Sequence, residues 1–272
     1  MYDFTSPPHF KVLEDIPWLD ARIFTAEGGH SLGTYAAPSG APGLNCAVQG
    51  NDNHVAKEMN RGKVAHCFGF EPEKLLTTKE EEDTICIIRV PWNIHSRPRD
   101  NSLILSEMFD YVAGILTCDC APVILADRRN KRAGIIHVGY RQVVNGLVDA
   151  TVKRMEDLGS RAAAIAAVIG PCAGVVDGTY IINARNNIII DRTITRDRDV
   201  KSFFKATGAE ATHGPLQSFQ MQDYIEFRLK QVGVGEVQCI RLDTMLDPRF
   251  YSRKSTPCGL MFSGIRLKRL HK

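Results

Sequence analysis

The sequence lacks any long hydrophobic run and carries little net charge. Its longest apolar run, residues 162–170, is far shorter than the roughly 20 residues of a membrane-spanning helix, so no membrane partner is expected. The formal net charge of +3 is too small to indicate binding to nucleic acid or to an anionic membrane surface. The first residues show no basic stretch followed by an apolar segment, so a secretory signal is not expected either.

Histidine and cysteine are not grouped as they would be in a protein that holds several coppers. The sequence has eight histidines, eight cysteines and no His-x-His pair, whereas a multicopper oxidase needs about ten such ligands grouped in several centres. This pattern excludes a multicopper oxidase. Because no secretory signal is expected, we interpret the cysteines as reduced thiols in the cytoplasm rather than as disulfides.

What the chain does contain is the composition of an ordinary globular protein. Its 272 residues are 44% hydrophobic and 24% charged, which suits one domain over residues 1–272 with no linker. Strand-like and helix-like runs alternate without strict βαβ repetition, which predicts a mixed-sheet α/β domain. Glycine-rich residues 28–31 are predicted to form a loop. The predicted helices cover residues 54–68, 141–158, 202–207 and 222–232, and the predicted strands cover 84–90, 122–126, 133–137, 163–169, 236–242 and 259–267.

The clearest chemical signal is a cysteine and a histidine at the ends of neighbouring strands. Cys120 ends a predicted strand that starts near Leu116, just before the predicted strand 122–126, and His137 ends the predicted strand 133–137. Both are therefore expected at the ends of neighbouring strands. A cysteine there acts as a nucleophile or metal ligand, or packs as a small apolar residue. The adjacent carboxylate of Asp119 favours a functional role. The imidazole of His137 supplies a general base, a zinc ligand or a structural hydrogen bond.

Two further residues are candidate partners of this pair. Arg141 begins the predicted helix 141–158, where free backbone N–H groups and a guanidinium together favour phosphate or carboxylate. The alternative is a surface arginine, although the helix dipole slightly disfavours a cation there. A zinc site needs a third ligand, and His95, in the loop after the predicted strand 84–90, is the candidate histidine nearest a strand end. The alternative for His95 is a solvated loop residue.

Several segments, in order along the chain, resemble the YfiH/YlmD family, also called the laccase-domain family. Residues 117–127, TCDCAPVILAD, resemble its T-A-D-C-x-P segment, and residues 137–141, HVGYR, resemble its H-A-G-W-R-G segment at the expected spacing. The weaker matches are residues 28–31, Asn45, residues 60–61, residues 169–171 with Tyr180, and residues 250–253. The likeness covers most of the chain.

The resemblance implies a fold and a reaction. The implied fold is a four-layer α/β/β/α sandwich with mixed sheets. The implied chemistry is phosphorolysis of a small-molecule purine nucleoside (adenosine, inosine or methylthioadenosine), with phosphate as co-substrate and adenosine deamination as a second activity. Arg141, Asn45 and Arg253 are the candidate residues that bind substrate and phosphate. A monomer is expected.

The resemblance also implies a zinc ion held by two histidines and one cysteine. Cys120 and His137 match two of these positions. The third falls on Pro91, in residues 89–92, and proline cannot bind a metal. His95 would complete the site only if the loop around it is rebuilt.

Three functions therefore remain open. The first is a purine nucleoside phosphorylase or adenosine deaminase. The second is a thiol hydrolase in which Cys120 is the nucleophile, His137 the base and Asp119 the supporting carboxylate. The third is a pseudoenzyme that keeps the fold with a degraded metal site.

Overall fold

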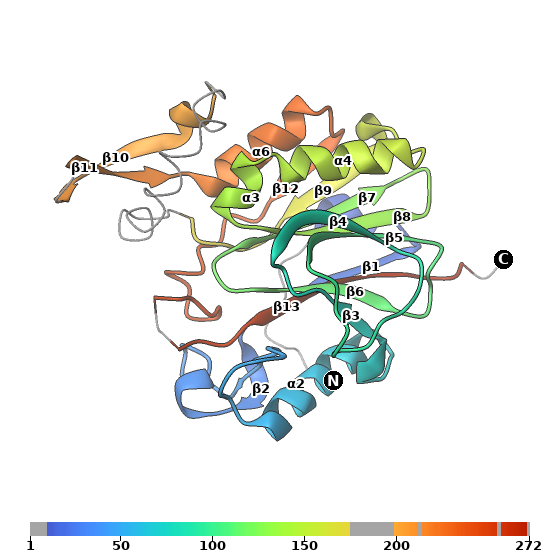
Figure 1. Ribbon diagram of the computed structural model, residues 1–272, viewed down its shortest axis with the longest axis horizontal. Helices are drawn as coiled ribbons and strands as arrows, with labels where there is room; N and C mark the ends of the chain where they lie inside the picture. The colour runs from blue at the N-terminus through green and yellow to red at the C-terminus, as the bar shows by residue number, and fades with distance from the viewer. Residues whose placement is uncertain (1–9, 175–198, 212–213, 255–256, 271–272) are drawn as a thin grey trace.

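The computed structural model of the chain contains two stacked β-sheets with helices on both outer faces (Figure 1). It describes residues 10–174, 199–211, 214–254 and 257–270. Within these residues the smaller sheet has four strands, in the order β1 (Leu19–Ile23), β13 (Met261–Leu267), β6 (Val112–Thr117) and β3 (Leu75–Thr77). The larger sheet, in the same described part, has six strands, in the order β12 (Glu236–Cys239), β9 (Ile165–Ile169), β7 (Ala121–Asp127), β8 (Arg132–Val138), β5 (Asp100–Ser106) and β4 (Glu82–Ile88).

Shorter strands and the helices complete the described chain. β2 (Glu27–Ser31) lies near α2, and β10 (Phe204–Ala211) and β11 (Gly214–Phe219) form an antiparallel ribbon that extends away from the sheets (Figure 1). The α-helices are α1 (Lys11–Glu14), α2 (His54–Cys67), α3 (Tyr140–Val144), α4 (Leu147–Asp157) and α6 (Met221–Gln231). The 3₁₀ turns are Gly33–Tyr35, Pro72–Lys74, Ala162–Ala164 and Val200–Phe203. No helix in the described part is long and apolar enough to cross a membrane.

Three apolar layers hold the sandwich together. Successive side chains of a strand point to opposite faces of its sheet. In β5, Ile104 therefore packs toward α4 and α6, while Leu103 and Leu105 pack toward the smaller sheet. On the far side of the smaller sheet, Phe262 packs against Phe68 at the end of α2. Both sheets contain parallel and antiparallel pairs. These layers confirm the predicted α/β/β/α sandwich with mixed sheets.

The chain crosses between the two sheets twice at one edge. β3 continues through residues 78–81 into β4, and β6 continues through residues 118–120 into β7. β3 and β6 are parallel neighbours, so their carboxyl ends, and with them both crossings, lie at the same edge. Each crossing holds a residue in the left-handed region, Glu80 with φ of 49° and Asp119 with φ of 70°. That conformation is uncommon outside glycine and is concentrated at functional sites.

Three predicted elements are corrected by the structure. The predicted helix 141–158 is divided into α3 and α4 because Gly146 adopts a φ of 80° between them. Residues 202–207, predicted to be helical, form a 3₁₀ turn and the start of β10. Residues 28–31, predicted to be a loop, belong to β2. The other predicted helices and strands are confirmed, with ends that shift by up to three residues.

Candidate functional site

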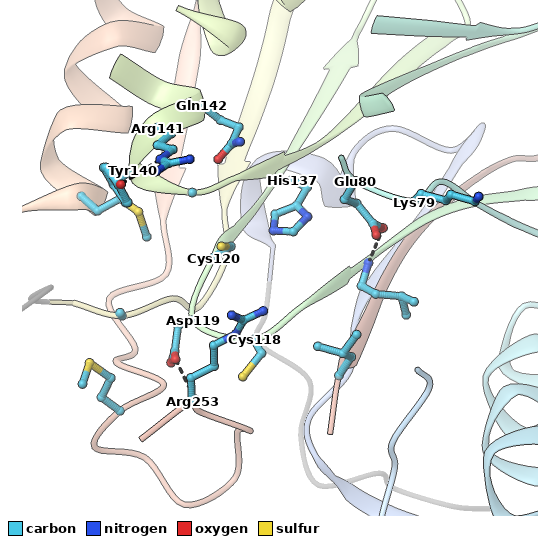
Figure 2. Close-up of a pocket in the computed structure, with 16 residues that line it drawn as sticks. Lys79, Glu80, Cys118, Asp119, Cys120, His137, Tyr140, Arg141, Gln142 and Arg253 are labelled. Carbon is cyan, nitrogen blue, oxygen red and sulfur yellow. Dashed lines mark hydrogen bonds between the residues drawn. The ribbon is translucent and has the colours of Figure 1, made fainter. Parts of the chain in front are cut away.

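A cavity of about 360 Å³ opens at the edge where the two crossings meet (Figure 2). Both crossings, the end of β8, the start of α3 and the loop before β13 contribute to its wall. The lining residues are Lys79, Glu80, Leu116, Cys118, Asp119, Cys120, His137, Gly139, Tyr140, Arg141, Gln142, Ala173, Met221, Met245, Arg253 and Leu260.

β7 and β8 bring Cys120 and His137 to the same wall of this cavity. The two strands are antiparallel, with Pro122 opposite His137, so the residue before β7 lies beside the end of β8. Both side chains border the cavity, and Figure 2 shows them next to one another. A Cβ atom on Gly139 would lie 3.2 Å from Cys120 Sγ, so the glycine leaves the thiol its space.

Burial determines the protonation of this pair at neutral pH. It raises the pKa of the Cys120 thiol to about 12, although nearby Arg253 acts in the opposite direction. It lowers the pKa of His137 to about 4, and Arg253 lowers it further. The thiol is therefore protonated and the imidazole neutral. His137 Nδ1 is buried without a hydrogen-bond partner in the described residues, so it is available to a bound ligand.

Asp119 holds the loop that carries Arg253. Its Oδ1 accepts a hydrogen bond from Thr244 Oγ1 at 2.8 Å. Its Oδ2 accepts one from the backbone N–H of Arg253 at 2.8 Å, which Figure 2 shows. A second contact restrains the same loop, because Cys118 Sγ lies 3.1 Å from Cys258 Sγ. Both oxygens of the Asp119 carboxylate thus stabilise the cavity wall, which is the geometry of a positioning residue.

Glu80 is a cavity residue that the sequence did not single out. It lies in the crossing from β3 to β4, and its Oε1 accepts a hydrogen bond from the backbone N–H of Leu116 at 3.1 Å. Burial raises the pKa of its carboxyl to about 8, although the Leu116 bond and the charge of Arg97 act to lower it. Sequence offers no signal for this, because Glu80 stands in the charged run KEEED, a pattern typical of a solvated loop.

Three cationic side chains border the cavity. Arg141 lies in α3, where its Nε donates a hydrogen bond to Tyr140 Oη at 2.9 Å. Arg253 reaches in from the loop that Asp119 holds, and Lys79 precedes Glu80. α3 has five residues, so Arg141 does not begin the long helix that the sequence predicted. Its guanidinium, rather than a helix dipole, is the source of positive charge here.

Two predicted site residues lie elsewhere. Asn45 is fully buried, where its Nδ2 donates to Asp52 Oδ2 and its Oδ1 accepts from the backbone N–H groups of Ala47 and Leu260. It supports the cavity through Leu260 and does not line it. His95 is exposed on the loop after β4 and also lies outside the lining. Pro91 is exposed on that loop as well.

The zinc site implied by the resemblance has two of its donors in place. Cys120 and His137 share the cavity, and His137 Nδ1 has no partner in the described chain. Among the described residues, however, no group of three or more histidine, cysteine, aspartate or glutamate side chains is arranged to hold a metal ion. A catalytic zinc site uses three protein ligands, and these residues do not form one.

Further lining residues, besides Glu80, were also missed by the sequence reasoning. Lys79 adjoins Glu80, while Met221 and Met245 come from α6 and from the segment after β12. Gln142 Nε2 donates a hydrogen bond to Asp83 Oδ1 at 2.9 Å. Only Gln142 had a usable signal, since it directly follows the HVGYR segment. The methionines are ordinary apolar residues until the fold brings them to the cavity.

Solved structures share this fold. The crystal structure of the Bacillus licheniformis hypothetical protein YfiH aligns with a TM-score of 0.76 and 21% identity, over 94% of this chain and 95% of that chain. YlmD from Geobacillus stearothermophilus aligns with a TM-score of 0.75 and 16% identity, over 93% of each chain. The sandwich is therefore of the YfiH type.

The sequence identifies the family. The family described as multi-copper polyphenol oxidoreductase laccase matches residues 20–268, and the chain belongs to it. Together with the YfiH and YlmD folds, this match confirms the YfiH/YlmD assignment suggested by the motifs. Tyr180, one residue of the resemblance, lies outside the described residues.

Curated relatives are named purine nucleoside phosphorylase. The protein ORF3 of Streptomyces griseus is 26% identical over 214 residues, which cover 72% of this chain and 85% of the relative. A Mycobacterium tuberculosis protein is 24% identical over 240 residues, covering 88% of both chains. A Streptomyces coelicolor protein is 31% identical over 129 residues, and the match spans 53% of its length.

Proposed function

We propose that the chain is a purine nucleoside phosphorylase and that nucleoside and phosphate meet in the cavity of Figure 2. In this reaction phosphate attacks C1′ of the ribose, the C1′–N9 bond breaks, and free base and ribose 1-phosphate are released. The observation that carries the proposal is the lining of the cavity, where cationic and apolar side chains occur together. The names of the curated relatives support it.

Phosphate is assigned to the cationic side chains of the cavity. Arg141 and Arg253 provide guanidinium groups, which match two phosphate oxygens at once. Lys79 adds a third positive charge at the wall. By neutralising the phosphate, these groups allow it to approach the ribose. Their charge also stabilises the dianionic sugar phosphate as it forms.

The purine is assigned to the apolar side chains of the cavity. Met221, Met245, Leu116 and Leu260 belong to its lining, and sulfur atoms and aliphatic side chains pack well against a flat aromatic ring. His137 and the neutral Cys120 thiol also border the cavity, and we assign them to hydrogen bonds with the ribose hydroxyls. Neither group needs a charge for this role, which agrees with the directions of their pKa shifts.

The thiol hydrolase hypothesis is less well supported by the same site. A cysteine nucleophile needs a lowered thiol pKa and a base that accepts its proton. Burial changes both groups in the wrong direction, because it raises the pKa of Cys120 and lowers that of His137. Asp119 is bonded to Thr244 and to the Arg253 backbone, which leaves the proposed triad unassembled.

The test is phosphate-dependent cleavage by the purified protein. Adenosine, inosine and methylthioadenosine are incubated with and without phosphate, and chromatography measures free base, sugar 1-phosphate and any deaminated nucleoside. Arg141→Lys keeps the charge but loses the planar fork, so we expect the KM for phosphate to rise at least tenfold. The matched control is Arg129→Lys, because Arg129 is exposed at the opposite end of the β7–β8 pair.

Two outcomes would contradict the proposal. Base release that does not depend on phosphate would indicate a hydrolase. Binding of nucleoside without release of base would indicate the pseudoenzyme. Equal effects of Arg141→Lys and Arg129→Lys on the KM for phosphate would remove Arg141 from the phosphate site.

A further inference from the structure

Glu80 is placed where it can reach a bound base. Its backbone sits in the left-handed region with φ of 49°, and the Leu116 N–H holds Oε1 of the carboxyl. Leu116 belongs to β6, so the carboxyl is attached to the rigid part of the smaller sheet. Figure 2 shows the carboxyl beside His137, with Lys79 and Glu80 on one side of the site and Arg141 on the other. This side chain borders the cavity but has no role in the mechanism above.

The surroundings of Glu80 keep its proton at neutral pH. Its carboxyl is partly buried, and this burial raises its pKa to about 8. The groups that face it are cationic Arg97, Lys79 and Arg253, with neutral Cys120 and His137. The charge of Arg97 lowers the pKa of Glu80, but by less than burial raises it.

A departing purine needs a proton donor. When the C1′–N9 bond breaks, the bonding electrons move onto the purine, and a purine anion is a poor leaving group. A proton added at N7 makes the departing base neutral. A general acid is most effective when its pKa lies near the working pH. Cys120, with a pKa of about 12, is too weak an acid, and His137, with a pKa of about 4, has already lost its acidic proton at neutral pH.

We propose that Glu80 is the general acid of the reaction and donates its proton to N7 of the purine as the C1′–N9 bond breaks. This inference rests on the proposed phosphorylase function and names its proton donor. The proton balance closes, because hydrogen phosphate loses one proton on becoming the sugar ester and the base gains one. After the base leaves, the Glu80 carboxylate regains a proton from solvent or from phosphate.

The test uses a substrate that needs no proton. In 7-methylinosine the methyl group on N7 already gives the imidazole ring a positive charge, so its base departs neutral without an acid. Glu80→Gln keeps the shape and the acceptor for the Leu116 N–H but has no proton to donate. We expect it to lower kcat/KM for inosine at least about 100-fold and to leave that for 7-methylinosine within a few-fold of wild type.

Two controls sharpen this comparison. Glu81→Gln changes the neighbouring exposed residue, which pairs with Arg99 at 3.2 Å, and should leave both substrates unaffected. In wild type, kcat/KM for inosine should fall as pH rises through about 8, where Glu80 loses its proton. That decrease should be absent with 7-methylinosine and in the Glu80→Gln variant.

The outcomes separate the two proposals. Wild-type protein that cleaves neither nucleoside with phosphate overturns the phosphorylase function, and the role of Glu80 with it. Wild-type protein that cleaves both, with Glu80→Gln losing both equally, overturns only the general acid. Thermal unfolding of each variant at the assay pH shows whether a loss on both substrates reflects an unfolded protein. In that case Glu80→Asp, which keeps an acid, must restore activity on inosine for the inference to stand.

Discussion

Asp119 offers a sharp test of how this cavity is held. Its carboxylate accepts hydrogen bonds from the hydroxyl of Thr244 and from the backbone N–H of Arg253, each at 2.8 Å. Asp119→Ala removes both bonds. Asp119→Asn can keep both, because its carbonyl oxygen accepts from the Arg253 N–H while its amide donates to the Thr244 hydroxyl. The pair of variants therefore separates geometry from charge.

The expected cost follows from these contacts. A hydrogen bond to a charged group contributes about 1.5 kcal/mol or more, so Asp119→Ala loses about 3 kcal/mol from two bonds. Alanine in the left-handed region adds about 1 kcal/mol, since φ is 70°. The total is about 4 kcal/mol, a large part of the 5–15 kcal/mol that is typical of a domain. Asp119→Asn keeps neutral bonds of roughly half the strength and should cost about 1.5 kcal/mol.

Urea unfolding and phosphate kinetics measure the two consequences. If Asp119 positions Arg253, Asp119→Ala should raise the KM for phosphate at least tenfold, while Asp119→Asn stays within about threefold of wild type. Asp119→Gly, which has no strain at positive φ, should recover about 1 kcal/mol relative to alanine. A kcat that falls equally in the alanine and asparagine variants would refute the reasoning, because it would show that the negative charge takes part in the chemistry.

Two further predictions concern protonation. Since burial raises the pKa of Cys120 to about 12, alkylation of Cys120 by iodoacetamide at pH 7, followed by peptide mass spectrometry, should be far slower than that of an unfolded control. Rapid modification would contradict the buried thiol. Glu80 binds its proton more tightly when folded, with a pKa of about 8 against 4.5, so its contribution to stability is full below pH 4.5 and is lost as pH rises through 8. Urea titrations at pH 5, 7 and 9 measure the free energy of unfolding of wild type and of Glu80→Gln. The difference, wild type minus variant, should decrease as pH rises. A difference that stays flat or rises would be inconsistent with a protonated Glu80.

The sequence predicted the layers of this protein because they depend on local patterns. The short apolar runs around Val123 and Ile135 indicate buried strands. The helix α2 begins where Asn53 caps it, with the Asn53 side chain accepting from the Ala56 N–H at 3.1 Å. Where pairing partners are distant, the local pattern was misleading. β10 is a strand because β11 pairs with it, and nothing within residues 202–207 indicates this.

The predicted helix 141–158 shows a different limit. The apolar spacing runs through Gly146 without interruption, and periodicity alone indicates one helix. The chain changes direction at Gly146, which has a positive φ. As a result α3 lies at the cavity and α4 lies along the larger sheet. A glycine inside a helical pattern lowers the confidence of a continuous helix, so this break was within reach of the sequence.

The sequence predicted those residues of the candidate site that are reactive and that lie at the ends of neighbouring strands. Cys120 and His137 are 17 residues apart in sequence on two strands joined by a turn, and antiparallel pairing alone brings them together. Glu80 reaches them through a parallel pair, β3 and β6, and its hydrogen-bond partner Leu116 lies 36 residues away. Its raised pKa comes from burial, which only the folded chain creates, while the Leu116 hydrogen bond acts to lower that pKa.

The position of the cavity follows from the architecture more than from any single motif. A chain that leaves one sheet to enter the other must interrupt both hydrogen-bond ladders, so backbone and side-chain groups at the crossing need other partners. Residues 78–81 and 118–120 both make this passage, and the Leu116–Glu80 hydrogen bond joins the first crossing to the strand that leads into the second. Asp119 supplies acceptors to the neighbouring loop in the same way.

Because the two crossings belong to parallel neighbours, their polar side chains gather at one edge, with the apolar layers on either side excluding water. The left-handed backbones of Glu80 and Asp119 are the local cost of that passage, and the rigid sheets behind them stabilise it.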